Sequence, residues 1–412
     1  MHIESIEQAK SVVSDVAVKT ILQSNKRLSD DYGAHIYLKR EDLQPVRSFK
    51  LRGAYNKIAN LSQEERVSGV VCASAGNHAQ GVALACQKLG IQGTIFMPVP
   101  TPKQKVNQVR MFGGSEINIQ LVGDTYDDAY HAAQSFCEMN KSTFVHPFDD
   151  DQVVAGQATL ALEIIEQSDV PIDYIFVPIG GGGLISGVLN VFKKLSPETK
   201  IIGIEPQGAP AMYNSLESGV NTSLSKIDPF VDGAAVRKVG DKAFMLCKSH
   251  LDDMILVSEG AICQTILKMY NKDAIVVEPA GAMSVAALKQ YAPQIKGKNV
   301  VCLICGGNND ITRMAEIKER ALLEAQLKHY FIVRFPQRAG ALKEFVAEVL
   351  GPDDDITFFE YSKKSNRANG PAVVGIEIKD KKHFKPLLKR MKEKGFYGDY
   401  INNKPDLFQF LI

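Results

Sequence analysis

Apolar residues gather in short runs along the first three quarters of the chain, and amphipathic stretches separate these runs. The runs occupy residues 35–39, 70–73, 93–97, 115–119, 174–179, 201–205 and 300–304. Most are apolar at successive positions, so both faces of each predicted strand are expected to be buried, as in a parallel sheet covered by helices. Helices are predicted between them, for example over 152–165 and 183–194. The pattern therefore predicts an α/β fold.

The pattern changes near Arg313, where a charge-rich helical stretch covers residues 315–328. Beyond it the predicted order is β, α, β, β, α, β. The segments are a strand at 329–335, a helix at 340–350, a hairpin of 356–362 with 372–378, a helix at 382–394 and a last extended piece. This order is the split βαβ arrangement of small α+β domains. We predict a first domain over 1–325, with a small subdomain of about 55–150 inserted in a large one, and a second domain over 326–412.

Composition narrows the function classes. The chain has 412 residues, a net charge of +1 and no long basic block, so the electrostatic signature of a nucleic-acid binder is missing. We see no signal peptide and no apolar run near the roughly 20 residues that span a bilayer, so we predict no membrane segment and a cytoplasmic location. Of the seven cysteines, Cys302 and Cys305 form a CxxC without a second pair, so no zinc site is predicted.

Lys50 is the first residue with candidate chemistry. It lies between Phe49 and Leu51 and follows Ser48, a predicted N-cap of a helix. Most lysines are solvated surface residues. Here, the positive end of the helix and the neighbouring arginines, Arg47 and Arg52, are expected to lower its pKa. A lysine amine becomes a covalent catalyst when its neighbours position it and lower its pKa, so Lys50 is a candidate for a Schiff base with an aldehyde cofactor.

Two loops are candidates for binding anions. Residues 74–77 (Ser-Ala-Gly-Asn) join a predicted strand to a helix, where backbone N–H groups attract an anion, although such strings also begin ordinary helices. Residues 180–183 are four glycines that lead into Leu184 and a helix, a pattern that lets backbone amides approach a phosphate closely.

A dinucleotide site is an alternative for the glycine run. Gly181 and Gly183 are followed about 20 residues later by Glu205, as in a dinucleotide fingerprint. However, Ser186 stands where the third glycine belongs, and this alternative leaves Lys50 and Asn77 unexplained. A dinucleotide-dependent oxidoreductase is thus the second hypothesis.

Together, these segments resemble the threonine dehydratase branch of the fold-type II pyridoxal-phosphate enzymes, which are tryptophan synthase β-like in fold. The resemblance covers nearly the whole chain and implies pyridoxal 5′-phosphate as the cofactor. It implies that Lys50 binds the cofactor aldehyde and later moves the substrate Cα proton, and that Phe49 flanks the ring. It implies a phosphate loop of Gly180, Gly181, Gly182, Gly183 and Leu184, and a substrate-carboxylate loop of Ser74, Ala75, Gly76, Asn77 and His78.

The resemblance also implies roles for single side chains. Asn77 hydrogen-bonds the 3′-oxygen of the cofactor, and Cys305 faces the ring nitrogen, which a thiol is too weakly acidic to keep protonated. From burial statistics alone, Cys305 is equally an inert core thiol. Related racemases carry a serine where this chain has Ala75, which favours elimination over racemisation. A racemase-dehydratase of the same fold remains an alternative.

The implied reaction is deamination of L-threonine to 2-oxobutanoate and ammonia, the first step of isoleucine biosynthesis, with L-serine a weaker substrate. Residues 335–342 resemble part of an ACT-like regulatory domain, which implies inhibition by isoleucine, opposition by valine and a tetramer. A dimerisation domain without a ligand, or a non-catalytic amino-acid sensor, stays open. Ala211 stands where relatives with a metal site near Glu205 have Asp, so no divalent metal is expected and a monovalent ion stays open. Glu278 is unassigned.

Overall fold

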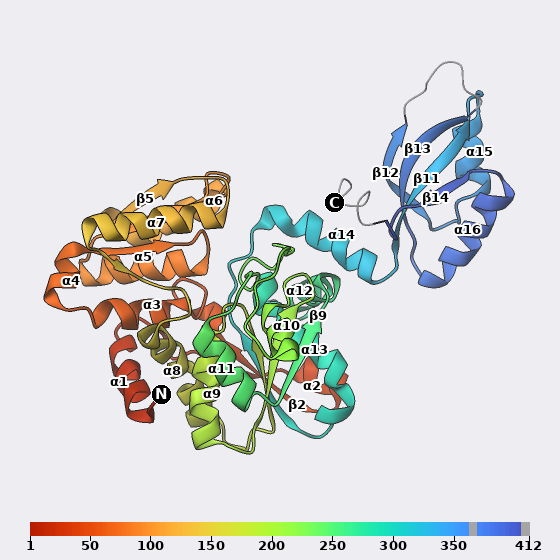
Figure 1. Ribbon diagram of the computed structural model, residues 1–412. Helices are drawn as coiled ribbons and strands as arrows, with labels where there is room; N and C mark the ends of the chain where they lie inside the picture. Colours follow the sequence, from red (N-terminus) through yellow and green to blue (C-terminus); the bar gives the residue numbers. More distant parts are fainter. Residues whose placement is uncertain (362–368, 405–412) are drawn as a thin grey trace. The chain divides into compact units, whose positions relative to one another are not determined.

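A computed structural model describes residues 1–361 and 369–404 of the chain. It divides into two compact units, Met1–Asp310 and Ile311–Ile412, which are treated separately below (Figure 1). The division falls about 15 residues before the predicted boundary. Helix α14 (Met314–Glu324), which we assigned to the first domain, therefore belongs to the second unit.

The first unit contains a six-stranded sheet in the order β1-β2-β10-β7-β8-β9. Its strands are β1 (Leu22–Ser24), β2 (His35–Arg40), β7 (Tyr174–Pro178), β8 (Lys200–Pro206), β9 (Asp253–Val257) and β10 (Asn299–Ile304). All neighbours are parallel except β1 and β2. The central β10 is almost fully buried, as its unbroken apolar run predicts.

A second, wholly parallel sheet has the order β5-β4-β3-β6. Its strands are β3 (Val70–Ala73), β4 (Gly93–Met97), β5 (Ile117–Leu121) and β6 (Thr143–Phe144). All four lie within the range predicted for the small subdomain. The α/β prediction for this unit is confirmed.

Helices surround both sheets of the first unit. They are α1 (Ile3–Val13), α2 (Lys26–Tyr32), α3 (Lys50–Ala59), α4 (Gln63–Ser68), α5 (Asn77–Leu89), α6 (Lys103–Gly113), α7 (Tyr126–Asn140), α8 (Asp151–Gln167), α9 (Gly183–Leu195), α10 (Ala211–Ser218), α11 (Asp241–His250), α12 (Glu259–Asp273) and α13 (Pro279–Ile295). Helices α5 and α8 both pack against α3, the helix that begins with Lys50. Within the described residues, no helix is long and apolar enough to cross a bilayer.

The second unit contains an antiparallel sheet in the order β12-β13-β11-β14. Its elements are β11 (Lys328–Pro336), α15 (Ala341–Glu348), β12 (Asp355–Tyr361), β13 (Asn369–Glu377), α16 (Phe384–Glu393) and β14 (Tyr397–Tyr400). The predicted β, α, β, β, α, β order is confirmed. Its core is built from residues such as Phe331, Phe345 and Leu387. Ser362, the predicted end of the first hairpin strand, lies outside the described residues.

Candidate active site

A cavity lies at the carboxyl ends of β7 and β10, which is where open α/β sheets usually bind ligands. Its lining comprises Phe49, Lys50, Phe148, Pro178, Gly180, Gly181, Gly182, Gly183, Leu184, Gly233, Ala234, Ala280 and Cys305. The fold thus brings together the predicted lysine, the glycine run and the cysteine. These groups are separated by more than 100 residues of sequence on either side of the glycine run.

Lys50 is the first residue of α3, and backbone contacts fix its position. The N–H of Phe49 donates to the carbonyl of Cys305 at 3.2 Å, and the N–H of Gly307 donates to the carbonyl of Arg47 at 2.9 Å. The prediction that Ser48 caps the helix is wrong. Phe49 is the N-cap residue and makes no side-chain cap bond, while the Ser48 hydroxyl is buried with no hydrogen-bond partner in the described structure.

The Lys50 side chain is half-buried, and its amine lies against the cavity wall. Its Nζ donates to the carbonyl of Pro147 at 3.1 Å and lies 5.3 Å from the centre of the Phe49 ring. Burial lowers the pKa of Lys50 from its usual 10.5 to about 8, against the opposing effect of Cys305 and Glu278. The predicted lowering of this pKa agrees with the structure. The predicted causes, the helix end and the neighbouring arginines, differ from the observed cause, which is burial.

The glycine run leaves no room for side chains. A Cβ on Gly181 would lie 2.1 Å from the Phe148 ring, and one on Gly183 would lie 3.0 Å from the Phe148 Cα. Gly182 has a φ of 96°, in the region that favours glycine. The backbone amides at the start of the 13-residue helix α9 are therefore free to face a ligand, and the helix dipole favours an anion there.

Cys305 lies opposite these groups in the cavity wall. It is buried, and burial raises the pKa of its thiol well above the usual value. The thiol is therefore neutral at ordinary pH and can serve only as a weak hydrogen-bond partner for a ring nitrogen.

Asn77 is held from two sides. Its Nδ2 donates to Glu278 Oε1 at 2.7 Å, and its Oδ1 accepts from Asn308 Nδ2 at 2.7 Å. Burial and the like charge of Asp232 raise the pKa of Glu278 to about 7, against the opposing effect of the Asn77 bond. Asn77 does not line the cavity, but its amide has a fixed orientation next to Gly306, at the end of the cavity that contains Cys305.

The rest of the predicted substrate loop lies near the start of α5 and outside the cavity lining. Gly76 N–H donates to Ser74 Oγ at 3.2 Å, and Ala75 packs against the core of the small sheet. His78 Nε2 lies 2.8 Å from the carbonyl of Val145. Burial and the nearby Lys50 lower the pKa of His78 to about 3, so its ring is neutral.

Several cavity residues were not predicted from the sequence. Phe148, Ala234 and Ala280 line it, and Glu278 orients Asn77. Phe148 and the alanines have no polar group to single them out. Glu278 stands directly before Pro279, at the N-cap of α13, and that position was its one available signal.

The residues present fit pyridoxal phosphate. The cavity offers an amine with a lowered pKa for the aldehyde, a loop of glycines without side chains at a helix start for the phosphate, and a neutral thiol for the ring nitrogen. Glu205, in contrast, is unsuited to a ribose. Its buried carboxylate accepts from the N–H groups of Met212 and Tyr213 at 2.8 and 2.9 Å and so caps α10. The dinucleotide hypothesis requires Glu205 to bond a ribose hydroxyl, so this contact of Glu205 counts against it.

Comparisons with known proteins agree with this geometry. Residues 13–306 match the family model "Pyridoxal-phosphate dependent enzyme", and residues 319–411 match "C-terminal regulatory domain of Threonine dehydratase". The chain is 56% identical over 412 residues to the "L-threonine dehydratase biosynthetic IlvA" of Bacillus subtilis, covering 100% of this chain and 98% of that relative.

Solved structures of similar fold also match most of this chain. The processed form of threonine deaminase isoform 2 from Solanum lycopersicum has a TM-score of 0.74 at 42% identity, covering 78% of this chain and 90% of that one. A serine racemase from Dictyostelium discoideum has a TM-score of 0.70 at 32% identity, covering 76% and 99%.

Proposed function

The chain belongs to the pyridoxal-phosphate-dependent threonine dehydratase family, and on this premise we propose that Lys50 is the residue that binds the coenzyme and moves the substrate proton. The protein is a biosynthetic L-threonine ammonia-lyase, which converts L-threonine to 2-oxobutanoate and ammonia at the start of isoleucine biosynthesis. The observation that supports the role of Lys50 is its buried amine in one cavity with the glycine run and Cys305.

The coenzyme, when bound, supplies an aldehyde for the amino group and a conjugated ring that stabilises charge at the substrate Cα. The side chains and backbone of the protein bind and orient the coenzyme and move the proton. The backbone amides of Gly180–Gly183 would hold the phosphate, Phe49 would pack beside the ring, and the neutral Cys305 thiol would leave the ring nitrogen without a full positive charge. Asn77, held by Glu278, would bond the 3′-oxygen. The amine of Lys50, whose pKa burial lowers to about 8, takes the Cα proton as hydroxide leaves Cβ.

The assay is release of 2-oxobutanoate from L-threonine by the purified protein. Lys50→Ala should reduce turnover about 1,000-fold or more, because the covalent and proton-transfer roles are both lost. Lys57→Ala is the matched control. Lys57 is on the same helix, but it pairs with Asp150 at 2.8 Å and does not line the cavity, so its loss should leave turnover nearly unchanged. Equal losses in both variants would contradict the assignment.

The substrate loop, 74–78, is proposed to hold the substrate carboxylate at the start of α5. Ala75 has no proton to donate, which favours elimination over racemisation. L-serine is proposed as a weaker substrate, because one methyl group in a pocket changes binding by only about 1–3 kcal/mol. A tetramer in the cytoplasm is proposed from the family resemblance.

The second unit is proposed to be an ACT-like domain, over about 326–412, that binds isoleucine as inhibitor, opposed by valine. From the sequence, the effector site is expected at the turn 335–342 or across a paired copy of the domain. A cavity lies at the other end of β11, and its lining includes His329, Lys381, Phe384 and Tyr400. The His329 and Phe384 rings stack with centroids 4.1 Å apart, which offers an apolar wall, and Lys381 offers a cation for a carboxylate.

These two locations can be separated by titrating threonine turnover with isoleucine. Lys381→Ala should weaken inhibition if the effector lies in the cavity, whereas Arg338→Ala should weaken it if the effector lies at the turn. Undiminished inhibition in both variants would contradict both locations.

A further inference from the structure

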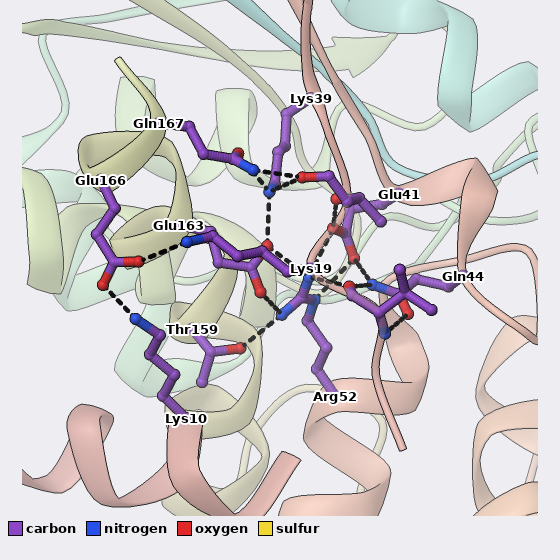
Figure 2. A network of polar contacts seen from close by, with 12 residues as sticks. Lys10, Lys19, Lys39, Glu41, Gln44, Arg52, Thr159, Glu163, Glu166 and Gln167 are labelled. Carbon is purple, nitrogen blue, oxygen red and sulfur yellow. Dashed lines mark hydrogen bonds and ion pairs between the residues drawn. The ribbon is translucent and has the colours of Figure 1, made fainter. Parts of the chain in front are cut away.

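A buried ion cluster holds the opposite side of the helix that begins with Lys50. Arg52, with an exposed fraction of 0%, donates through Nε and Nη2 to Glu41 at 2.8 and 2.9 Å. Its Nη1 and Nη2 donate to Glu163 at 2.7 and 3.0 Å, and Nη1 also donates to Thr159 at 3.1 Å. Figure 2 shows the guanidinium between the two carboxylates. Each carboxylate thus receives a two-point contact.

The cluster connects three separate elements. Glu41 begins the 3₁₀ turn η1 (Glu41–Leu43) after β2, Arg52 is on α3, and Glu163 is on α8. Lys39 donates to Glu163 at 2.6 Å, so two cations balance two carboxylates in the buried region. Burial lowers the pKa of Arg52, but its two carboxylates outweigh this effect and raise it. Burial likewise raises the pKa of Glu41, but Arg52 outweighs this effect and lowers it, so Arg52 and Glu41 stay charged.

Helix α3 has almost no freedom to shift along these contacts. A Cβ on Gly156 of α8 would lie 2.4 Å from the Arg52 carbonyl, and a Cβ on Gly81 of α5 would lie 3.1 Å from the Lys50 carbonyl. Backbones therefore touch on both sides of the helix. Rotation about the helix axis is restrained by buried apolar side chains such as Leu51 and Ile58, but these contacts, unlike hydrogen bonds, have no fixed direction.

Arg52 can set this rotation. Residues two apart on an α-helix point about 200° away from each other, so Lys50 faces the cavity when Arg52 faces Glu41 and Glu163. A guanidinium group that must bond two fixed carboxylates at once allows little rotation of the helix that carries it. We propose that Arg52, clamped by Glu41 and Glu163, is a positioning residue that aims the Lys50 amine at the coenzyme aldehyde.

Stability alone is a poor explanation for this cluster. Taking charges out of water costs free energy, and apolar residues of similar volume often stabilise a core as well or better than a buried ion pair. Apolar side chains in the same place would not fix the orientation of the helix, because their contacts have no preferred direction. The inference rests on the proposed role of Lys50, and the experiment separates failure of one from failure of the other.

The test compares Arg52→Lys with the parent protein. Lysine keeps the charge but loses the fork, so α3 should lose its fixed rotation. We expect the dissociation constant of pyridoxal phosphate, measured by absorbance titration of apoprotein, to rise at least tenfold. Hydroxylamine should also release the coenzyme from the holoenzyme at least tenfold faster. Glu41→Gln, which keeps the shape but weakens one half of the fork, should change both in the same direction.

Arg27→Lys is the matched control. Arg27 makes a similar forked contact with Asp273, with Nε to Oδ1 at 3.0 Å, but it lies on α2, and its hydrogen bonds go to Asp273 and Asp31. It should lower the unfolding midpoint without changing the coenzyme constant more than twofold. If Arg52→Lys does not fold, as judged by circular dichroism, Glu41→Gln decides.

Unchanged coenzyme binding and release in the folded variants would overturn the positioning role. Equal effects in Arg27→Lys would overturn it too, because the response would then be one of general stability. If borohydride reduction of the parent places the coenzyme on a residue other than Lys50, the proposed function fails instead. If the coenzyme is found on Lys50 and coenzyme binding and release are unchanged in the variants, only the positioning role of Arg52 is contradicted.

Discussion

The chemistry depends at the residue scale on one buried amine. Lys50 is enclosed by Phe49, Cys305 and the Pro147 carbonyl, and this burial makes the charged ammonium unfavourable. No cation in the cavity wall is needed for the effect. Arg52, which the sequence suggested as a cause, instead forms ion pairs with Glu41 and Glu163.

A pH dependence follows from the lowered pKa of Lys50. Only the neutral amine attacks an aldehyde, so the rate at which apoprotein takes up the coenzyme should rise with pH and level off above about 8. Cys305, Glu278 and His78 face the same region. The first is neutral below that pH, the His78 ring is uncharged, and Glu278 titrates near 7, so a shoulder there is expected.

Stopped-flow absorbance measures this uptake, and free N-acetyl-lysine is the reference. The rate at which its free side-chain amine reacts with the coenzyme should keep rising up to about pH 10.4. A protein profile that also rises through pH 10 would show that burial does not act on Lys50 as described.

Ala75 offers a test of the choice between elimination and racemisation. Ala75→Ser places a hydroxyl at the position where related racemases carry one. We expect D-serine to form from L-serine in the variant at a rate that chiral chromatography detects, while the parent forms none. D-serine production by the parent protein would contradict the elimination assignment.

At the scale of elements, the phosphate cradle is a strand, a glycine loop and a helix start. Gly181→Ala forces a Cβ into the Phe148 ring, and such overpacking costs about 1–3 kcal/mol. Because the loop must move to relieve it, coenzyme affinity should fall about tenfold or more. Absorbance titration measures this.

Gly187→Ala is the control for the cradle. A Cβ on Gly187 would lie 2.8 Å from the Ala158 Cα, so α9 is overpacked against α8 but away from the loop. Thermal unfolding should show a loss of stability, and coenzyme affinity should change little. Equal losses of affinity in both variants would show that the loop has no special part in binding.

Most of the strands that the sequence predicted are runs of mainly apolar residues. Strands β3, β4, β7 and β10 are of this kind. Strand β9 was missed because it begins with Asp253 and is half-exposed at the edge of the sheet, and β6 is only two residues long.

The site residues that were predicted from the sequence also belong to recognisable local motifs. Lys50, the glycine run and Cys305 stand in short motifs and meet in one cavity, whereas the Arg52 cluster was not predicted. Glu41 and Glu163 are far apart in sequence and resemble solvated charges until the fold buries them. Pairing over such distances is a property of tertiary structure and leaves no local pattern.

The whole molecule consists of a catalytic unit and a regulatory unit that have separate cores. A chain ending at Asp310 keeps the whole cavity, because all of its lining residues lie in the first unit. Such a chain should retain threonine turnover within about tenfold and lose its response to isoleucine, since domains with their own cores can act alone. Persistent inhibition by isoleucine would place the effector site in the first unit.

The most direct test of the account locates the coenzyme on the chain. The purified protein is reduced with borohydride, digested and analysed by mass spectrometry. A phosphopyridoxyl group on the peptide that contains Lys50 is the predicted result. The same group on another lysine, or on no peptide of a protein that turns over threonine, would contradict the account.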